Sequence, residues 1–197
     1  MGFNKYTERQ IEIMEAATLR IDKFGIQELT IKNLSNDLNL SEAALYRHFK
    51  SKNDILLGLL NYFIFDMQNR ISIILCDSNK TPTEMLRELF ASQLTTFEKK
   101  PAIVSVIFAE GIFQFNKELS EQVTTMMKLM QTNIGNIIKK GQDEGVFNKL
   151  LGVSATTTVV MGSMRMVVLK WKLSGHQSNL IKDGQTVLNG LLKLLEK

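Results

Sequence analysis

Apolar residues recur at intervals of three and four along most of the chain, and the strict alternation typical of strands is scarce. Residue types compatible with helix dominate, and proline occurs only twice. The pattern therefore predicts an all-α protein of about nine helices. The predicted helices span roughly residues 6–24, 31–38, 42–49, 52–76, 82–99, 101–109, 117–143, 153–174 and 178–196.

Capping residues support the boundaries of the N-terminal helices. Gly25 suits the C-cap of the first helix, and Thr30, Ser41 and Ser51 are good N-caps for the next three. Two short helices joined by a tight turn and preceded by a longer one match the helix-turn-helix arrangement. The chain is therefore expected to form a small N-terminal bundle followed by a larger helical body.

The second short helix has the side chains needed to enter a groove of DNA. Leu45 and Phe49, four residues apart, are expected to pack inward on the supporting helices. On the outside, Ala43 and Ala44 permit close approach to a thymine methyl, and Arg47 can pair with guanine or a phosphate. An ordinary amphipathic helix with a polar surface gives the same pattern, so the pattern alone leaves both interpretations open.

Charge does not decide between these interpretations. The net charge is +4, but residues 1–54 hold eight Lys and Arg against eight Asp and Glu, so this segment is neutral. A nucleic-acid partner must therefore be argued from the placement of individual side chains rather than from bulk charge. Glu42 is unsuited to a phosphate patch, although a carboxylate can accept a hydrogen bond from cytosine.

The stretch "LTIKNLSNDLNLSEAALYRHFKSKNDIL", residues 29–56, resembles the DNA-binding signature of the TetR family of bacterial regulators. The matching features are the start at Thr30, the "LNLS" turn, the "LY-x-HF" core and the Lys52 that follows. Asn39 stands where the family usually has glycine. Asparagine tolerates the left-handed backbone conformation, so the turn is expected to form.

The resemblance implies an all-helical homodimer that acts as a transcriptional repressor on double-stranded DNA with a near-palindromic operator. It places a helix-turn-helix DNA-binding domain at residues 1–52 and a helical ligand-binding and dimerisation domain at residues 53–197. The implied DNA contacts are Thr30, Lys32, Ser41, Glu42, Ala43, Ala44, Tyr46, Arg47, His48 and Lys52.

The helical body is rich in Met and Phe, which serve equally well as ordinary core and as adaptable walls of an apolar cavity. Because members of the family typically hold a small molecule among these helices, we expect a pocket for a small apolar or amphipathic effector. The side chains expected to line it are Phe63, Met67, Phe90, Leu94, Phe108, Met127 and Met130.

The last two predicted helices have apolar faces too broad for a single neighbour within the chain, which favours contact with a second chain. By resemblance these helices form a four-helix dimer interface. A dimer would present two recognition helices to two half-sites about one turn of DNA apart. The residues expected in the interface are Val160, Met164, Val167, Trp171, Leu188, Leu191, Leu192 and Leu195.

Other function classes find little support. We see no Gly-rich phosphate loop, no metal-ligand spacing and only two histidines, so no catalytic residue, metal or cofactor is expected. The lone Cys76, in an apolar run, is expected to be a buried thiol. With no cleavable apolar leader and no apolar run near the 18 or so residues that span a bilayer, the protein is expected to be soluble and cytoplasmic, with no membrane partner.

A second, weaker resemblance supplies the alternative function. The apolar positions of residues 41–52, 69–81 and 100–119 line up with a nucleoid-associated member of the TetR family that binds DNA and also a cell-division protein. Most polar positions do not line up. The alternative is therefore a nucleoid-associated protein with a division partner rather than a local repressor.

Overall fold

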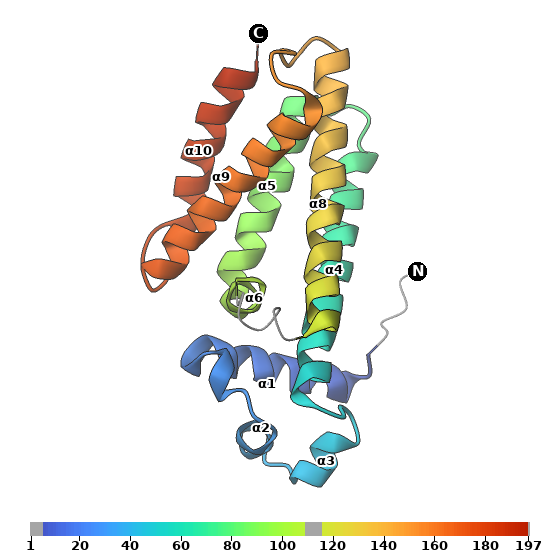
Figure 1. Cartoon of the computed structure of the whole chain (residues 1–197), viewed down its shortest axis with the longest axis vertical. Coiled ribbons are helices and arrows are strands. Elements are labelled where there is room, and N and C mark those ends of the chain that lie inside the picture. Colours follow the sequence, from blue (N-terminus) through green and yellow to red (C-terminus); the bar gives the residue numbers. More distant parts are fainter. Residues whose placement is uncertain (1–5, 109–115, 197) are drawn as a thin grey trace. The chain divides into compact units, whose positions relative to one another are not determined.

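The computed structural model describes residues 6–108 and 116–196, and in these ranges the protein is all-α, as predicted (Figure 1). The described residues form nine α-helices and one short 3-10 helix, η1, at Ile26–Glu28. The α-helices are α1 Glu8–Phe24, α2 Ile31–Asp37, α3 Glu42–Tyr46, α4 Lys52–Cys76, α5 Pro82–Lys99, α6 Pro101–Ile107, α8 Lys117–Asp143, α9 Val153–Leu173 and α10 Leu180–Leu195.

The N-terminal helices begin at the caps expected from sequence. The hydroxyls of Thr30 and Ser41 accept hydrogen bonds from backbone N–H groups three residues on, at 3.1 Å each. Ser51 does the same for the N–H of Asp54 at 3.1 Å. Each hydroxyl satisfies one of the donors left free in a first helical turn. The one notable difference is α3, which ends at Tyr46 rather than near residue 49.

Internal contacts divide the chain into two compact units. The first contains residues up to Ile64 together with Lys100–Thr124, and the second contains Phe65–Lys99 together with Thr125–Lys197. Helices α4 and α8 contribute to both units. The first unit also includes the first part of α4 and all of α6, which packs against α1.

The first unit has a small apolar core under the helix-turn-helix. Ile13, Met14, Ala17 and Ile21 of α1 are buried, at the three- and four-residue spacing of one helix face. Close by, the guanidinium of Arg20 donates to Asp37 of α2 at 2.8 Å. This hydrogen bond lowers the pKa of the Asp37 carboxyl below its ordinary value.

The second unit contains α5, α9 and α10, with α10 packed against both of the others. Gly184 of α10 lies so close to α5 that an added Cβ would stand 2.0 Å from Leu94. The end of α10 is held by the loop after α8, where the N–H of Asn148 donates to the carbonyl of Leu195 at 2.7 Å. Cys76 is exposed at the end of α4, so the expectation of a buried thiol was wrong.

Candidate nucleic-acid interface

Helix α3 and the three residues after it, here called the α3 segment (residues 42–49), are anchored by two apolar side chains, as predicted. Leu45 is fully buried and Phe49 is 5% exposed. The rest of the segment faces outward. Glu42, Ala43, Tyr46 and Arg47 are exposed, and Ala44 and His48 are half-buried. The predicted base-reading side chains therefore share one accessible surface with small residues at its N-terminal end.

The turn between α2 and α3 uses the asparagine that replaces the usual glycine. Asn39 has a φ of 54°, in the left-handed region. The following N–H, of Leu40, donates to the carbonyl of Ser35 at 2.8 Å. Asparagine therefore does here what the sequence predicted of it.

A contact that sequence reasoning missed braces the end of the recognition segment. The side-chain amide of Gln10 donates to the carbonyl of His48 at 3.1 Å, while its oxygen accepts from the N–H of Thr7 at 3.0 Å. The Thr7–Gln10 pair is a capping box that the spacing T-x-x-Q reveals in the sequence. The hydrogen bond from Gln10 to His48, 38 residues away, has no comparable pattern in the sequence that would predict it.

Three of the expected DNA contacts already have partners within the chain. Thr30 and Ser41 use their hydroxyls as caps. The ammonium of Lys52 donates to the carbonyl of Ile26 at 2.9 Å, which ties the start of α4 to the loop after α1. Partial burial lowers the pKa of Lys52, opposed by the charge of Glu28. Lys52 thus braces the bundle, whereas Lys32 is simply exposed.

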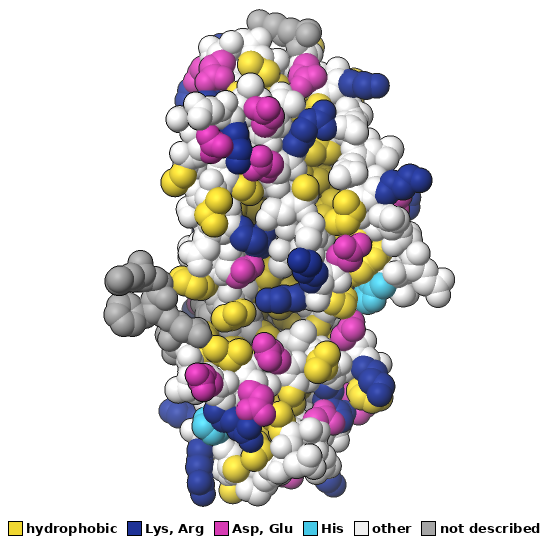
Figure 2. Space-filling view, turned by 180° about the vertical axis from the view of Figure 1, so that it is seen from behind, with side chains coloured by type: hydrophobic (Ala, Val, Ile, Leu, Met, Phe, Trp, Pro, Cys, Tyr) yellow, Lys and Arg dark blue, Asp and Glu magenta, His cyan; other side chains and the backbone are white. Residues whose placement is uncertain are grey.

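Charge is mixed rather than concentrated. On the face shown in Figure 2, Lys and Arg side chains are interspersed with Asp and Glu. In the first unit Arg9 pairs with Glu12 and Arg20 with Asp37. These pairs reduce the charge available to attract DNA at long range.

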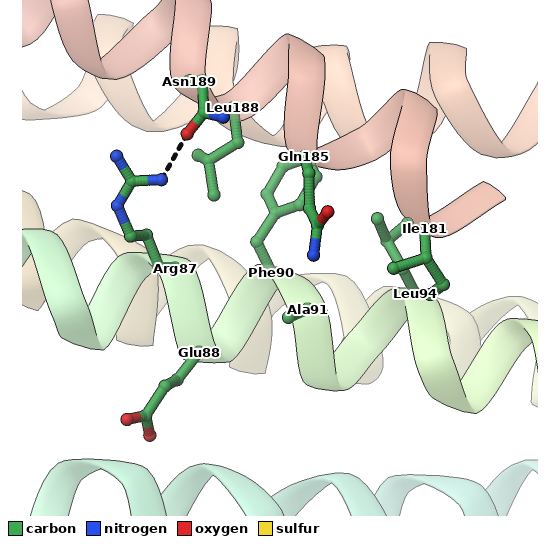
Figure 3. Close-up of a pocket in the computed structure, with 9 residues that line it drawn as sticks. All are labelled: Arg87, Glu88, Phe90, Ala91, Leu94, Ile181, Gln185, Leu188 and Asn189. Carbon is green, nitrogen blue, oxygen red and sulfur yellow. Dashed lines mark hydrogen bonds between the residues drawn. The ribbon is translucent and has the colours of Figure 1, made fainter. Parts of the chain in front are cut away.

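The side chains expected to line an effector pocket divide between the two units. Phe90 and Leu94 line a pocket of about 290 Å³ between α5 and α10 (Figure 3). Phe63, Met67 and Met130 are buried and do not line it. Phe108 is half-buried and Met127 is 47% exposed on α8. Phe63 and Phe108 belong to the first unit and the other five residues to the second.

Most of the residues expected at a dimer interface lie inside the chain's own core. Val160, Met164, Val167, Trp171, Leu188, Leu192 and Leu195 are each 9% exposed or less, and Leu191 is half-buried. They cover the sides of α9 and α10 that pack on each other and on α5. Their side chains therefore contribute to the core of this chain.

Another side of α9 is apolar and uncovered. Val159, Met166 and Leu173 are 47%, 56% and 78% exposed. With Ala155, Gly162 and Leu169 they repeat at alternating spacings of four and three, which is the period of a helix seam that packs against other helices. On helix α10 the exposed Val187, Gly190 and Leu194 have the same spacing, and the charged Asp183 stands one turn before them. We call these two rows the α9–α10 stripe.

A helix-turn-helix with an accessible second helix, linked to a larger helical body, defines a DNA-binding regulator. Residues 13–59 match the family model of bacterial regulatory proteins of the tetR family, and residues 59–194 match that of the YsiA-like protein C-terminal region. The chain therefore belongs to the TetR family of bacterial regulatory proteins.

Individual relatives are more distant. The nucleoid occlusion factor SlmA of Vibrio campbellii is 27% identical over 141 residues, which make up 71% of each chain. A putative transcriptional regulator from Saccharomonospora viridis, solved in complex with choline, superposes with a TM-score of 0.83 at 19% identity, over 96% of this chain and 98% of that one. FadR from Bacillus subtilis, in complex with stearoyl-CoA, gives a TM-score of 0.75 at 21% identity, over 92% and 97%. These structures share the fold.

Two further observations concern other kinds of site. No helix in the described ranges has both the length and the apolar character needed to cross a membrane. Among the same residues, His, Cys, Asp and Glu side chains nowhere gather in threes at a spacing that would hold a metal ion.

Proposed function

We propose that the protein is a transcriptional repressor that binds a near-palindromic operator as a homodimer and changes its operator affinity when a small apolar or amphipathic effector binds. The observation that carries the proposal is the exposed face of the α3 segment, which Leu45 and Phe49 fasten from below and Gln10 braces at its end. Family membership supports the same function. A protein that binds operator DNA acts in the cytoplasm, and the proposed function involves no catalytic step.

On this proposal the residues of the α3 segment divide into two groups. Ala43, Ala44 and Arg47 contact base edges in the major groove, where small residues admit a thymine methyl and Arg47 pairs with guanine. Tyr46 and His48 donate to phosphates and set the register of the helix. Around them, the caps of α2 and α3 and exposed Lys32 bring backbone and side-chain donors to the phosphates. Glu42 would accept from a cytosine amino group.

Arg47→Ala is expected to cost about 1–3 kcal/mol of binding to the selected operator and to relax the preference at one base pair, because the bidentate contact is lost. Lys32→Gln should instead weaken all sequences alike and reduce the salt slope by about one. The measurement is selection of DNA by the purified protein, followed by titrations of both variants at several salt concentrations. Unchanged affinity and preference in Arg47→Ala would show that α3 is not the reader.

The α9–α10 stripe is the surface on which we place the second chain. Its exposed apolar residues repeat with the period of a helix seam, and two such helices from each chain can form a four-helix interface. An added Cβ at Gly162 or Gly190 would meet no atom of this chain within 4 Å, so both positions leave room for close approach of another helix. Dimerisation then supplies the two recognition helices that a near-palindrome requires.

An effector is supported by the fold neighbours solved with small molecules, choline in one and stearoyl-CoA in another. The buried Met and Phe side chains of the helical body, Met67 and Met130 among them, suit a wall that adapts to an apolar ligand. The test is a screen of apolar and amphipathic compounds on the protein bound to its selected operator. A true effector should shift operator affinity by roughly five- to 150-fold.

A second candidate function rests on the likeness to SlmA, which is named as a nucleoid occlusion factor. In this alternative the protein binds many dispersed chromosomal sites and a cell-division protein as well. Genome-wide mapping of the bound sites separates the two candidates. One or two promoter sites support the local repressor, and many dispersed sites support the nucleoid-associated role.

A further inference from the structure

The pocket of about 290 Å³ between α5 and α10 has an apolar floor and one charged end (Figure 3). We call it the α5–α10 groove. Phe90 and Leu94 are 1% exposed and Leu188 is 3% exposed, so the apolar side chains are fixed by packing. The residues that line it are Arg87, Glu88, Phe90, Ala91, Leu94, Ile181, Gln185, Leu188 and Asn189. Its volume lies at the lower end of the range typical of small-molecule sites.

The groove lies on a different side of α10 from the α9–α10 stripe. Gln185 and Asn189 line the groove, whereas Val187 and Gly190 belong to the stripe. At 100° per residue, Asn189 points about 160° away from Val187 around the helix axis, and Gln185 about 140° away from Gly190. A second chain packed on the stripe therefore leaves the groove open.

One cation, Arg87, faces the groove, and the hydrogen bond that it makes there is to an uncharged group. The guanidinium of Arg87 reaches from α5 and donates to the side-chain oxygen of Asn189, which is a neutral partner (Figure 3). The only carboxylate in the lining is that of Glu88, which points away from α10 and is held by Lys80 at 2.6 Å. The guanidinium of Arg87 thus has N–H donors left for a ligand. The side-chain amides of Gln185 and Asn189, both on α10, line the groove as well.

We propose that the α5–α10 groove binds an amphipathic anion with a short hydrocarbon chain. The hydrocarbon chain lies against the half-buried side chains of Ala91 and Ile181, above the buried Phe90, Leu94 and Leu188, and the carboxylate is held by Arg87. A guanidinium binds a carboxylate by paired, charge-assisted hydrogen bonds, and its present neutral partner is weaker. The small volume excludes a long acyl chain. The binding claim stands on the groove alone, whereas a regulatory role for it rests on the proposed function.

The test is calorimetric or NMR titration of the full-length protein with octanoate, with 1-octanol as an uncharged probe of similar size. We expect a dissociation constant below about a millimolar for octanoate and much weaker binding of octanol. Arg87→Gln should weaken octanoate binding roughly tenfold to a hundredfold, because a charge-assisted contact is lost. Ala91→Leu should weaken both probes, because it fills the groove and leaves Arg87 in place.

The control is Lys193→Gln, which removes a positive charge from an exposed position of α10 outside the groove and should leave octanoate binding unchanged. Absence of octanoate binding, equal binding by Arg87→Gln, or an equal loss in Lys193→Gln would each overturn the proposal. Operator titration with octanoate separates the two claims. If octanoate binding depends on Arg87 but operator affinity does not change, the groove is a binding site without a regulatory role. If an effector changes the operator affinity of Arg87→Gln as much as that of the unmodified protein, the repressor function stands and the effector binds outside the groove.

Discussion

Replacing Met166 and Leu194 together with aspartate is expected to give a folded monomer with strongly reduced operator binding. Both side chains lie on the α9–α10 stripe, 56% and 74% exposed, so neither carboxylate is buried in the isolated chain. In the dimer both would be buried without a partner, at a cost of several kcal/mol each. Sedimentation velocity measures the loss of the dimer, and circular dichroism checks that the helices remain.

The matched control is Leu188→Asp on the same helix. Leu188 is 3% exposed and packs within its own chain, where an unpaired carboxylate destabilises the fold itself. This variant should lose several kcal/mol of stability rather than dissociate into folded monomers. A monomer reads one half-site, so the stripe variant should bind the operator at least roughly a hundredfold more weakly. A stripe variant that stays dimeric would show that the chains meet elsewhere.

The contrast expected between these two variants illustrates why an interface is hard to place from sequence. Helix α9 has only a narrow polar side, formed by Ser154, Thr158, Arg165 and Lys172, and buried Val160 stands next to exposed Val159. A narrow polar side leaves more than one apolar face, and periodicity does not say which of them faces inward. On α10 the pattern correctly groups Leu188 and Leu192 on one face. Periodicity cannot tell whether such a face meets its own chain or another.

The helix-turn-helix was predictable because its signals are local. Thr30 and Ser41 cap the helices that begin at the next residue, and Asn39 adopts its left-handed conformation within one turn. The contacts that brace the bundle join residues far apart in sequence. Gln10 reaches His48 and Lys52 reaches Ile26, and no spacing in the chain announces either hydrogen bond. The resemblance suggested a DNA contact for Lys52, and its hydrogen bond to Ile26 is an additional interaction that the sequence did not predict.

The location of an effector pocket is hard to predict from sequence for a different reason. Met and Phe content indicates side chains that adapt to a ligand, but it does not locate empty space. Met127 belongs to that set and is 47% exposed, whereas Phe90 and Leu94 line the α5–α10 groove. That groove depends on Gly184, which brings α10 onto α5 at one point. Where two helices cross is set by tertiary packing, and amino-acid composition does not predict it.

Gly141→Ala is expected to destabilise the protein by roughly 2–3 kcal/mol, although alanine is the better helix former. An added Cβ would stand 2.1 Å from the ring of Phe147, which is 1% exposed and cannot move as a flexible chain end would. Overpacking of this kind costs about 1–3 kcal/mol, and displacing a buried Phe adds to it. The gain in helix propensity is at most about 1 kcal/mol, so the clash outweighs it and the substitution lowers the free energy of unfolding.

Gly135→Ala, on the same helix, is the control for that sign. Its Cβ would lie 3.5 Å from the hydroxyl of Thr157, an ordinary contact, so only the propensity gain of about 0.5–1 kcal/mol remains. Urea unfolding of both variants at one fixed protein concentration measures the difference, since dimerisation makes stability depend on concentration. The two substitutions should shift the midpoint in opposite directions. Equal stabilisation by both would mean that Phe147 moves aside freely, and that its contacts at the end of α10 contribute little to holding the second unit together.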